Sequence, residues 1–317
     1  MTGAVRRYGV QLALIGVAVV WGATFVVVKD AVALYPMYSF IALRFAIAIV
    51  AFVAVVPSSV RLLSRDVVGV GLLAGALLTA GYVLQTWGLQ DTSASKAAFI
   101  TGLFVVITPA LQALVLRRPP HVVTVAGVGL AVTGLWLLSG ADGGGWNVGD
   151  TRVLLCAVAY SAHMIVLGSL GRAHDVRPLT LVQLVTVAVA CAGVALASEP
   201  VALPQHASVW WALVITGVLG SAVAFAVQTY AQRFLSPSRT ALILISEPAF
   251  GGLFGWIAGE RLGIGGFAGA ALILAGMVLA EVVRPVEGVG AGFEPSLEGP
   301  PVQIADETAA DGEISGR

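Results

Sequence analysis

Apolar residues dominate this chain in long runs, and polar residues are confined to the short stretches between them. About 20 apolar residues form an α-helix long enough to cross the hydrocarbon core of a bilayer. Strands of a membrane β-barrel would instead alternate polar and apolar residues over about ten positions, a pattern that this chain lacks. Breaks at charges, prolines and glycine clusters predict ten membrane helices, at residues 10–29, 37–56, 67–88, 95–116, 122–140, 152–170, 178–197, 208–230, 239–258 and 263–283.

The composition supports an all-α integral membrane protein. Hydrophobic residues make up 58 % of the chain and charged residues 11 %, with a mean hydropathy of +0.94. Soluble domains are about 25 % charged. The two cysteines, Cys156 and Cys191, lie inside apolar segments, which favours buried, unpaired thiols over a disulfide. The first apolar run follows "VRRYG" without a convincing cleavage site, so we expect an uncleaved first span rather than a signal peptide.

Basic residues near the helix ends predict the orientation, because cytoplasmic loops carry an excess of lysine and arginine. With a cytoplasmic N-terminus, the inner loops hold eleven basic residues and the outer loops hold four. Both termini are then cytoplasmic. From Glu287 onward the chain holds seven acidic residues and one base, Arg317, among many glycines and prolines. Residues 286–317 are therefore predicted to form a disordered acidic tail.

The chain also repeats itself at a nearly constant offset. "QTWGLQDTSASKAA" begins at Gln85 and "QTYAQRFLSPSRTA" begins at Gln228, 143 positions later. "WGAT" from Trp21 pairs with "YSAH" from Tyr160 at an offset of 139. These matches predict two five-helix repeats, residues 1–145 and 146–285. Because five is odd, the second repeat is inserted upside down, a plan typical of secondary transporters whose site lies between the halves.

A proline interrupts the fourth span of each half. Thr108-Pro109 lies in "FVVITPALQALVL" and Glu247-Pro248 in "SEPAFGGLFGWIAGERLG". Proline removes a backbone donor and presses on the preceding turn, so we expect a kink at both sites. Within a bilayer, such a kink is tolerated where neighbouring helices or a cavity satisfy the backbone.

Three polar residues inside predicted spans are candidates for substrate binding or coupling. The Glu247 carboxylate is costly at bilayer depth unless it faces a cavity, has a partner or takes up a proton, and the alternative is a packing role beside Pro248. Arg44 lies about seven residues into the second span, where it pairs with Glu247, holds carbonyls or contacts an anionic substrate. His163 is either a proton relay or a hydrogen-bonding partner of a neighbouring helix.

Six further residues belong to the candidate site, and two lysines lie at its edges. Gln85 and Gln228, followed two residues later by Trp87 and Tyr230, end the third span of each half and line a cavity or join helices. Trp21 and Tyr160 are either cavity walls or lipid-facing side chains. Lys29 and Lys96, at outer helix ends, are interpreted as solvated anchors, with substrate contact as the alternative.

Over residues 10–283 the chain resembles the EamA-type family of the drug/metabolite transporter superfamily. The matching stretches are Trp21-Gly22 with Lys29, Arg44-Phe45, "TSASKAAFITGLFVVITP" and "SEPAFGGLFGWIAGERLG". The resemblance implies two antiparallel five-helix repeats around a central cavity. It also implies a protein that exports small metabolites, amino acids or drugs by exchange or proton coupling. The first repeat has "RRPP" where the second has "GERL", so Glu260 is not expected to be half of a symmetric site.

The sequence therefore predicts a secondary active exporter rather than an enzyme. Its partners are a small-molecule substrate, with or without protons, and the lipid bilayer of a bacterial cytoplasmic membrane, and the protein is a monomer or homodimer. No cofactor, metal site or nucleic-acid partner is expected: the four histidines are scattered and no phosphate-binding loop is present. The alternatives are a membrane enzyme, which would require a clustered catalytic set, and a membrane sensor.

Overall fold

The computed structural model describes residues 3–115, 122–139 and 145–282, and within these ranges it contains helices, turns and loops but no β-strand. The predicted tail and the "RRPP" segment lie outside the described residues. Helices cover most of the described chain, with bounds α1 Gly3–Val32, α2 Met37–Val55, α3 Ser58–Arg61, α4 Arg65–Leu89, α5 Ala94–Gly102, α6 Phe104–Val115, α7 Val122–Ser139, α8 Val148–Ser169, η1 Gly171–Ala173, α9 Val176–Ser198, α10 Ala207–Gly217, η2 Val218–Val223, α11 Ala224–Ala231, α12 Pro237–Ile243, α13 Ser246–Ile257 and α14 Gly263–Val282.

Each predicted apolar segment coincides with a helix or with consecutive helices in line. Among the described residues, seven stretches are long and apolar enough to cross a bilayer: Tyr8–Val32, Met37–Val55, Arg65–Leu89, Ala94–Leu114, Val148–Ser169, Val176–Ser198 and Ala207–Ala231. Shorter apolar helices cover Val125–Leu138 and Gly263–Leu279. Large apolar side chains such as Trp136 and Ile264 are 75 % and 91 % exposed. Such a surface suits contact with lipid rather than water.

The fourth span of each half is broken, as the prolines predict, but the break precedes the proline. In the first half Leu103 separates α5 from α6, and Pro109 lies within α6. In the second half, residues 244–245 separate α12 from α13. The break there falls four residues before Pro248, where the ring of a proline presses on the carbonyl of the preceding turn. The Leu244 carbonyl accepts instead from the Glu247 backbone N–H at 2.9 Å.

Besides the breaks in the two fourth spans, the continuous helix formed by α10, η2 and α11 contains a third irregularity, which the sequence did not predict. Its middle turn, η2, is π-helical. A π-helical turn widens the helix by one residue and leaves backbone groups available to partners outside it, which is why such turns are frequent at functional sites. Gly217 precedes this turn, and a Cβ there would lie 2.8 Å from the carbonyl oxygen of Arg44.

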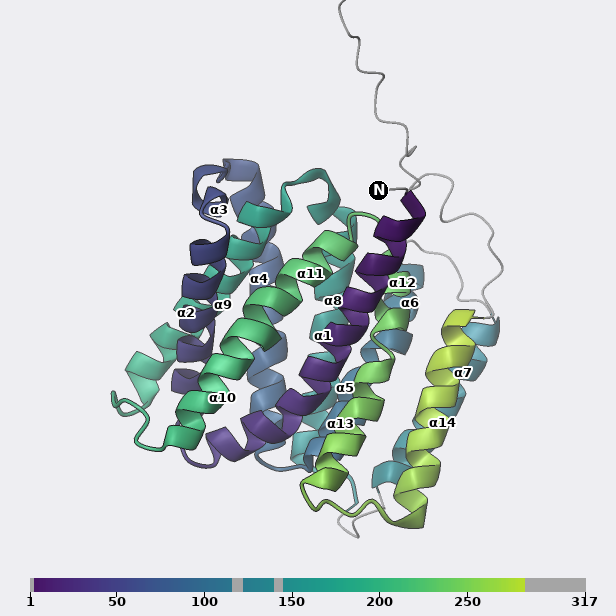
Figure 1. The fold of residues 1–317 in the computed structure, drawn as a ribbon. Helices are drawn as coiled ribbons and strands as arrows, with labels where there is room; N and C mark the ends of the chain where they lie inside the picture. Colours follow the sequence, from purple (N-terminus) through teal and green to yellow (C-terminus); the bar gives the residue numbers. More distant parts are fainter. Residues whose placement is uncertain (1–2, 116–121, 140–144, 283–317) are drawn as a thin grey trace, which may run out of the picture. The chain divides into compact units, whose positions relative to one another are not determined.

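Helices of the first half pack mainly on helices of the second. The most extensive contacts are those of α7 with α14, α4 with α8 and α9, α2 with α9, and α1 and α5 with α13. Figure 1 shows α7 and α14 lying side by side along their length. Glycines allow this approach, because a Cβ on Gly134 would lie 2.5 Å from the Gly269 carbonyl oxygen. The two halves are therefore interleaved, and residues distant in sequence meet between them.

Candidate functional site

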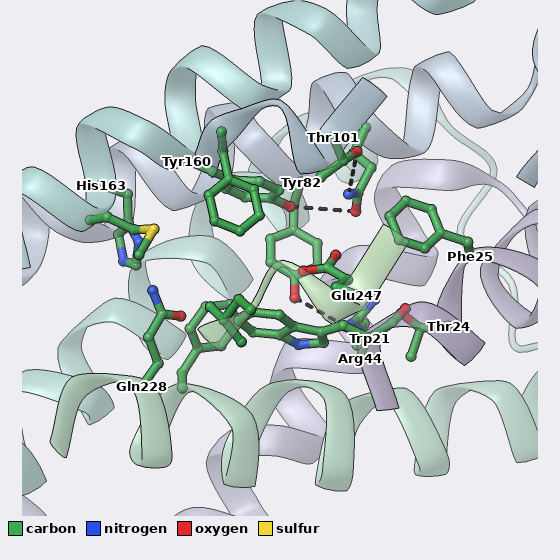
Figure 2. Close-up of a pocket in the computed structure, with 15 residues that line it drawn as sticks. Trp21, Thr24, Phe25, Arg44, Tyr82, Thr101, Tyr160, His163, Gln228 and Glu247 are labelled. Carbon is green, nitrogen blue, oxygen red and sulfur yellow. Dashed lines mark hydrogen bonds between the residues drawn. The ribbon is translucent and has the colours of Figure 1, made fainter. Parts of the chain in front are cut away.

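A cavity lies between the two halves, with about 510 Å³ of unfilled space including its opening. Aromatic and polar side chains from both halves surround it (Figure 2). Its lining consists of Trp21, Thr24, Phe25, Arg44, Tyr82, Gln85, Thr101, Phe104, Tyr160, His163, Met164, Phe225, Gln228, Leu244 and Glu247.

The lining residues follow the offsets of the sequence repeat. All but Arg44 fall into pairs separated by 139 or 143 positions. In the first spans of the halves the pairs are Trp21 with Tyr160, Thr24 with His163, and Phe25 with Met164; in the third and fourth spans they are Tyr82 with Phe225, Gln85 with Gln228, Thr101 with Leu244, and Phe104 with Glu247. Corresponding positions of the two halves thus face the same space.

Glu247 lies in the first turn of α13, directly after the helix break, and its side chain faces the cavity (Figure 2). The residue is only 4 % exposed, and its Oε2 atom has no hydrogen-bond partner. Its counterpart across the repeat is Phe104. The proline motifs predict Thr108 as the counterpart of Glu247, but Thr108 is fully buried, donates to the Phe104 carbonyl at 2.7 Å, and does not line the cavity.

Arg44 is held by the π-helical turn rather than by Glu247. Its Nε donates to Ser221 Oγ at 2.9 Å, and an Nη donates to Tyr82 Oη at 3.1 Å and to the Gly220 carbonyl at 3.5 Å. The guanidinium also lies 4.7 Å from the centre of the Tyr82 ring, a cation–π geometry. Among the described residues, Arg44 forms no ion pair with Glu247 within 4.0 Å. Of the alternatives raised by the sequence, the structure supports contacts to a carbonyl and hydroxyls.

Trp21 binds the same turn, since its indole Nε1 donates to the Gly220 carbonyl at 2.8 Å. This bond fixes the ring at the wall of the cavity, where it packs against Phe225 with ring centres 5.5 Å apart. The Gly220 carbonyl thus accepts from two lining residues, and a Cβ on Gly220 would lie 3.1 Å from an Arg44 nitrogen. The π-helical turn therefore positions both an aromatic and a cationic side chain of the first half.

The two repeat-related glutamines both reach the cavity, but their hydrogen bonding differs. Gln85 donates to Thr101 Oγ1 at 3.3 Å and accepts from Tyr160 Oη at 3.4 Å. The Oε1 atom of Gln228 is buried without a partner. The amide of the first half is thus engaged by its neighbours, while that of the second half is available.

His163 bonds to a neighbouring helix, one of the two roles considered from sequence. Its Nε2 lies 2.8 Å from Gln183 Oε1 on α9, and Gln183 Nε2 donates in turn to the Leu179 carbonyl at 3.1 Å. Because the second bond orients the amide with its oxygen toward the ring, Nε2 is the protonated nitrogen. The imidazole ring is nearly perpendicular to the Phe225 ring, with ring centres 6.1 Å apart.

Trp87 and Tyr230 do not line the cavity. Trp87 is 42 % exposed with Arg152 over its ring, and Tyr230 is 39 % exposed against Phe234. Positions two apart on an α-helix point to nearly opposite sides, so a helix that turns Gln85 inward turns Trp87 outward. The same spacing rule identifies lining residues that the sequence analysis missed: Thr24, Phe25, Tyr82, Met164 and Phe225 each lie three or four positions from a residue named above.

At the N-terminal end of α5, away from the cavity, charged residues form a separate cluster. Lys96, expected to be a solvated anchor, is 1 % exposed and pairs with Asp150 of α8 at 2.8 Å. Lys29 donates to the Thr92 carbonyl at 2.6 Å. Glu260 accepts from the backbone N–H groups of Ala94 and Ser95 at 2.7 and 2.8 Å and so caps α5. Glu260 does not line the cavity.

The two cysteines and the residues able to bind metal complete the description of the predicted features. Cys156 and Cys191 are free and buried, as expected. Within the described ranges, no group of three His, Cys, Asp or Glu residues is arranged to hold a metal ion.

Comparison with known proteins decides the family. The sequence pattern of the EamA-like transporter family matches residues 8–140 and again residues 147–281. The chain belongs to the EamA-like transporter family. It is 30 % identical over 287 residues to an uncharacterized transporter of Archaeoglobus fulgidus, covering 90 % of this chain and 83 % of that protein.

A solved crystal structure shares the fold of this EamA-like protein. It aligns with a TM-score of 0.67 and 19 % identity, over 89 % of this chain and 99 % of the other. The EamA-like protein is thus a multi-pass membrane transporter. The family's sequence pattern occurs twice in the chain, and residues from both matched ranges line the cavity.

Proposed function

We propose that this EamA-like protein is a secondary active transporter that exports a small metabolite, amino acid or drug by alternating access. In this proposal, ten membrane helices form two inverted five-helix repeats, residues 1–145 and 146–285, with both termini in the cytoplasm. The observation that carries it is the paired lining of the cavity: corresponding positions of the two halves face one space, as they do when inverted repeats enclose a central site.

The broken fourth spans provide a physical basis for alternating access. α5 and α13 pack closely, with Gly102 of one against Pro248 of the other. Each is joined to the remainder of its span through an interruption beside the cavity, at Leu103 and at residues 244–245. An interruption of this kind lets two halves of a span tilt separately, as discontinuous helices do in other transporters. Exposure of the cavity to one side and then the other requires such movement.

Glu247 is the residue proposed to couple transport to an ion gradient. A buried carboxylate without a hydrogen-bond partner is costly when charged, so it favours either a bound proton or a bound cation. When the cavity opens to water, the charged form is stabilised by solvation. Alternation between these environments would bind and release a proton on opposite sides of the membrane. Exchange of one substrate molecule for another is the alternative mechanism.

The proposal is tested by flux into and out of proteoliposomes for a panel of amines, amino acids, nucleosides and organic acids, with and without a proton gradient. We expect protein-dependent flux of at least one compound, and gradient-driven accumulation that Glu247→Gln abolishes. Asp66→Asn, which removes an exposed carboxylate in the first turn of α4, serves as the matched control. Absence of flux for every compound would contradict the transport proposal, and unchanged gradient dependence in Glu247→Gln would contradict coupling at this residue.

A further inference from the structure

Two buried polar atoms in the cavity lack partners, and both are hydrogen-bond acceptors. They are Oε2 of Glu247 and Oε1 of Gln228. The two residues are 4 % and 3 % exposed, and both line the cavity from the second half of the chain (Figure 2). A buried acceptor without a donor costs free energy, so in a native protein such an atom is paired with a group from outside the chain, either an ordered water or a ligand.

Most other polar groups of the lining are already bonded within the protein. Gln85 bonds Thr101 and Tyr160, His163 bonds Gln183, and the hydroxyl of Tyr82 accepts from Arg44. The bonds left unmade therefore require a donor. Water or a neutral hydroxyl supplies a donor but no charge.

The charge of Glu247 is also unmatched by the protein. Among the described residues, no lysine, arginine or histidine forms an ion pair with it within 4.0 Å. Arg44, which lines the same cavity, directs its Nε to Ser221 and an Nη to Tyr82, and its charge lies over the Tyr82 ring. A carboxylate at this depth calls for a bound proton or a positively charged partner, and a cationic ligand supplies the second.

The walls around these acceptors are aromatic. Trp21, Tyr82, Tyr160 and Phe225 come from four different helices, and their rings contact one another edge to face or tilted, at 5.5–6.0 Å between centres. Aromatic faces stabilise a cation through their quadrupoles and pack well against flat apolar groups. The surroundings thus suit a charged head attached to an apolar body.

We propose that Glu247 and Gln228 form a binding seat for the protonated amine of the substrate, whose flat apolar body lies among the aromatic walls. The substrate class is an organic amine. This inference rests on the proposed function, because it assumes that the cavity is the transport site. It adds what the family does not state: the charge of the substrate, and which half of the cavity recognises it.

The test measures binding to the purified full-length protein in lipid nanodiscs by isothermal titration calorimetry. The probes are 2-phenylethylamine, 2-phenylethanol and 3-phenylpropanoate, which share an aromatic body and differ in the charge of the head. We expect the amine to bind more tightly than either analogue by roughly tenfold or more, since loss of a buried charge partner is costly. Equal or tighter binding of the carboxylate probe would overturn the proposal.

Variants locate the amine in the cavity. Glu247→Gln preserves the shape of the side chain and should weaken amine binding by roughly 30-fold or more, while Gln228→Leu should weaken it by several-fold. Asp66→Asn, an exposed carboxylate on another helix, should bind the amine as the wild type does. Amine binding unchanged by Glu247→Gln would overturn the seat, provided that the variant retains the wild-type elution profile and melting temperature.

Counterflow of the same probes in proteoliposomes separates this inference from the proposed function. Flux of organic acids without flux of amines would leave the transporter intact and refute the amine seat. Amine binding that depends on Glu247, without flux of any compound, would support the seat and contradict transport. Flux of amines that is lost in Glu247→Gln supports both.

Discussion

At the scale of single residues, burial decides what a charge does in this protein. Lys96 and Asp150 are 1 % and 0 % exposed and pair at 2.8 Å, with Thr92 donating to the other Asp150 oxygen at 2.7 Å. Asp175 and Arg177, by contrast, pair at the surface. Breaking a buried pair leaves a charge without compensation, whereas an exposed pair contributes little.

This difference predicts unequal effects of the same substitution. Asp150→Asn should lower the stability of the folded protein by about 3 kcal/mol, because Lys96 stays buried without its counter-charge. Asp175→Asn should cost less than about 1 kcal/mol, because asparagine also caps α9 and the lost ion pair is exposed. Melting temperatures of the two variants in one detergent provide the comparison. Equal losses would show that the buried pair contributes no more than the surface one.

Glu247 shows the same rule in a functional setting. Lys96 is buried with a counter-ion, while Glu247 is buried without one. A structural role explains the first residue completely. The second remains costly until a proton or a ligand arrives, and this cost is the physical reason to place it at the centre of the proposed function.

At the scale of elements, departures from the regular α-helix occur where the cavity is. The breaks before α6 and α13 precede Phe104 and Glu247, and the π-helical turn η2 presents Gly220 and Ser221 to Trp21 and Arg44. Helices remote from the cavity, such as α7 and α14, are uninterrupted and pack through glycines instead. The irregular backbone thus lies beside the cavity, and the regular helices form the surrounding scaffold.

The glycine contacts of α7 yield a test with an internal control. Gly134→Ala would bring its Cβ within 2.5 Å of the Gly269 carbonyl oxygen and 2.8 Å of the Ile273 nitrogen, backbone atoms that cannot yield without separating α7 from α14. We expect a loss of about 1–3 kcal/mol. Gly129→Ala on the same helix meets nothing within 4 Å and should be neutral or slightly stabilising. Thermal unfolding of both variants measures this, and a Gly134→Ala protein as stable as wild type would contradict the packing.

At the scale of the whole molecule, the proposed ten-helix topology predicts which loops share a side of the membrane. α3 lies at the same end as the first turns of α1, and the loop before α10 lies at the opposite end (Figure 1). The excess of basic residues predicts that the end with α3 is cytoplasmic.

Cysteine labelling tests this topology. Single cysteines at Arg61 and at His206, both exposed, should react with a membrane-impermeant maleimide from opposite sides of intact cells, with His206→Cys labelled from outside and Arg61→Cys only after permeabilisation. The native thiols of Cys156 and Cys191 are buried and should contribute little background. Labelling of both positions from the same side would refute the proposed number of spans or their orientation.

The hydrophobic pattern alone predicted where the helices run, since each apolar segment must satisfy its backbone internally within lipid. The repeat offsets of 139 and 143, visible in the sequence, reappear as the pairing of cavity residues, and seven of the predicted site residues line the cavity: Trp21, Arg44, Gln85, Tyr160, His163, Gln228 and Glu247. The type of each residue and its position along its own helix were enough to predict these site residues.

Only the tertiary structure decided which of these residues have partners. Gln85 and Gln228 are alike in sequence, yet one amide is bonded and the other is not. Arg44 is bound by Ser221, 177 positions away, and Lys96 is buried by Asp150 rather than solvated. Hydrogen bonds and burial depend on helices that meet only when the chain is folded, so the sequence determined the scaffold and the candidates, and the packing between the halves determined their chemistry.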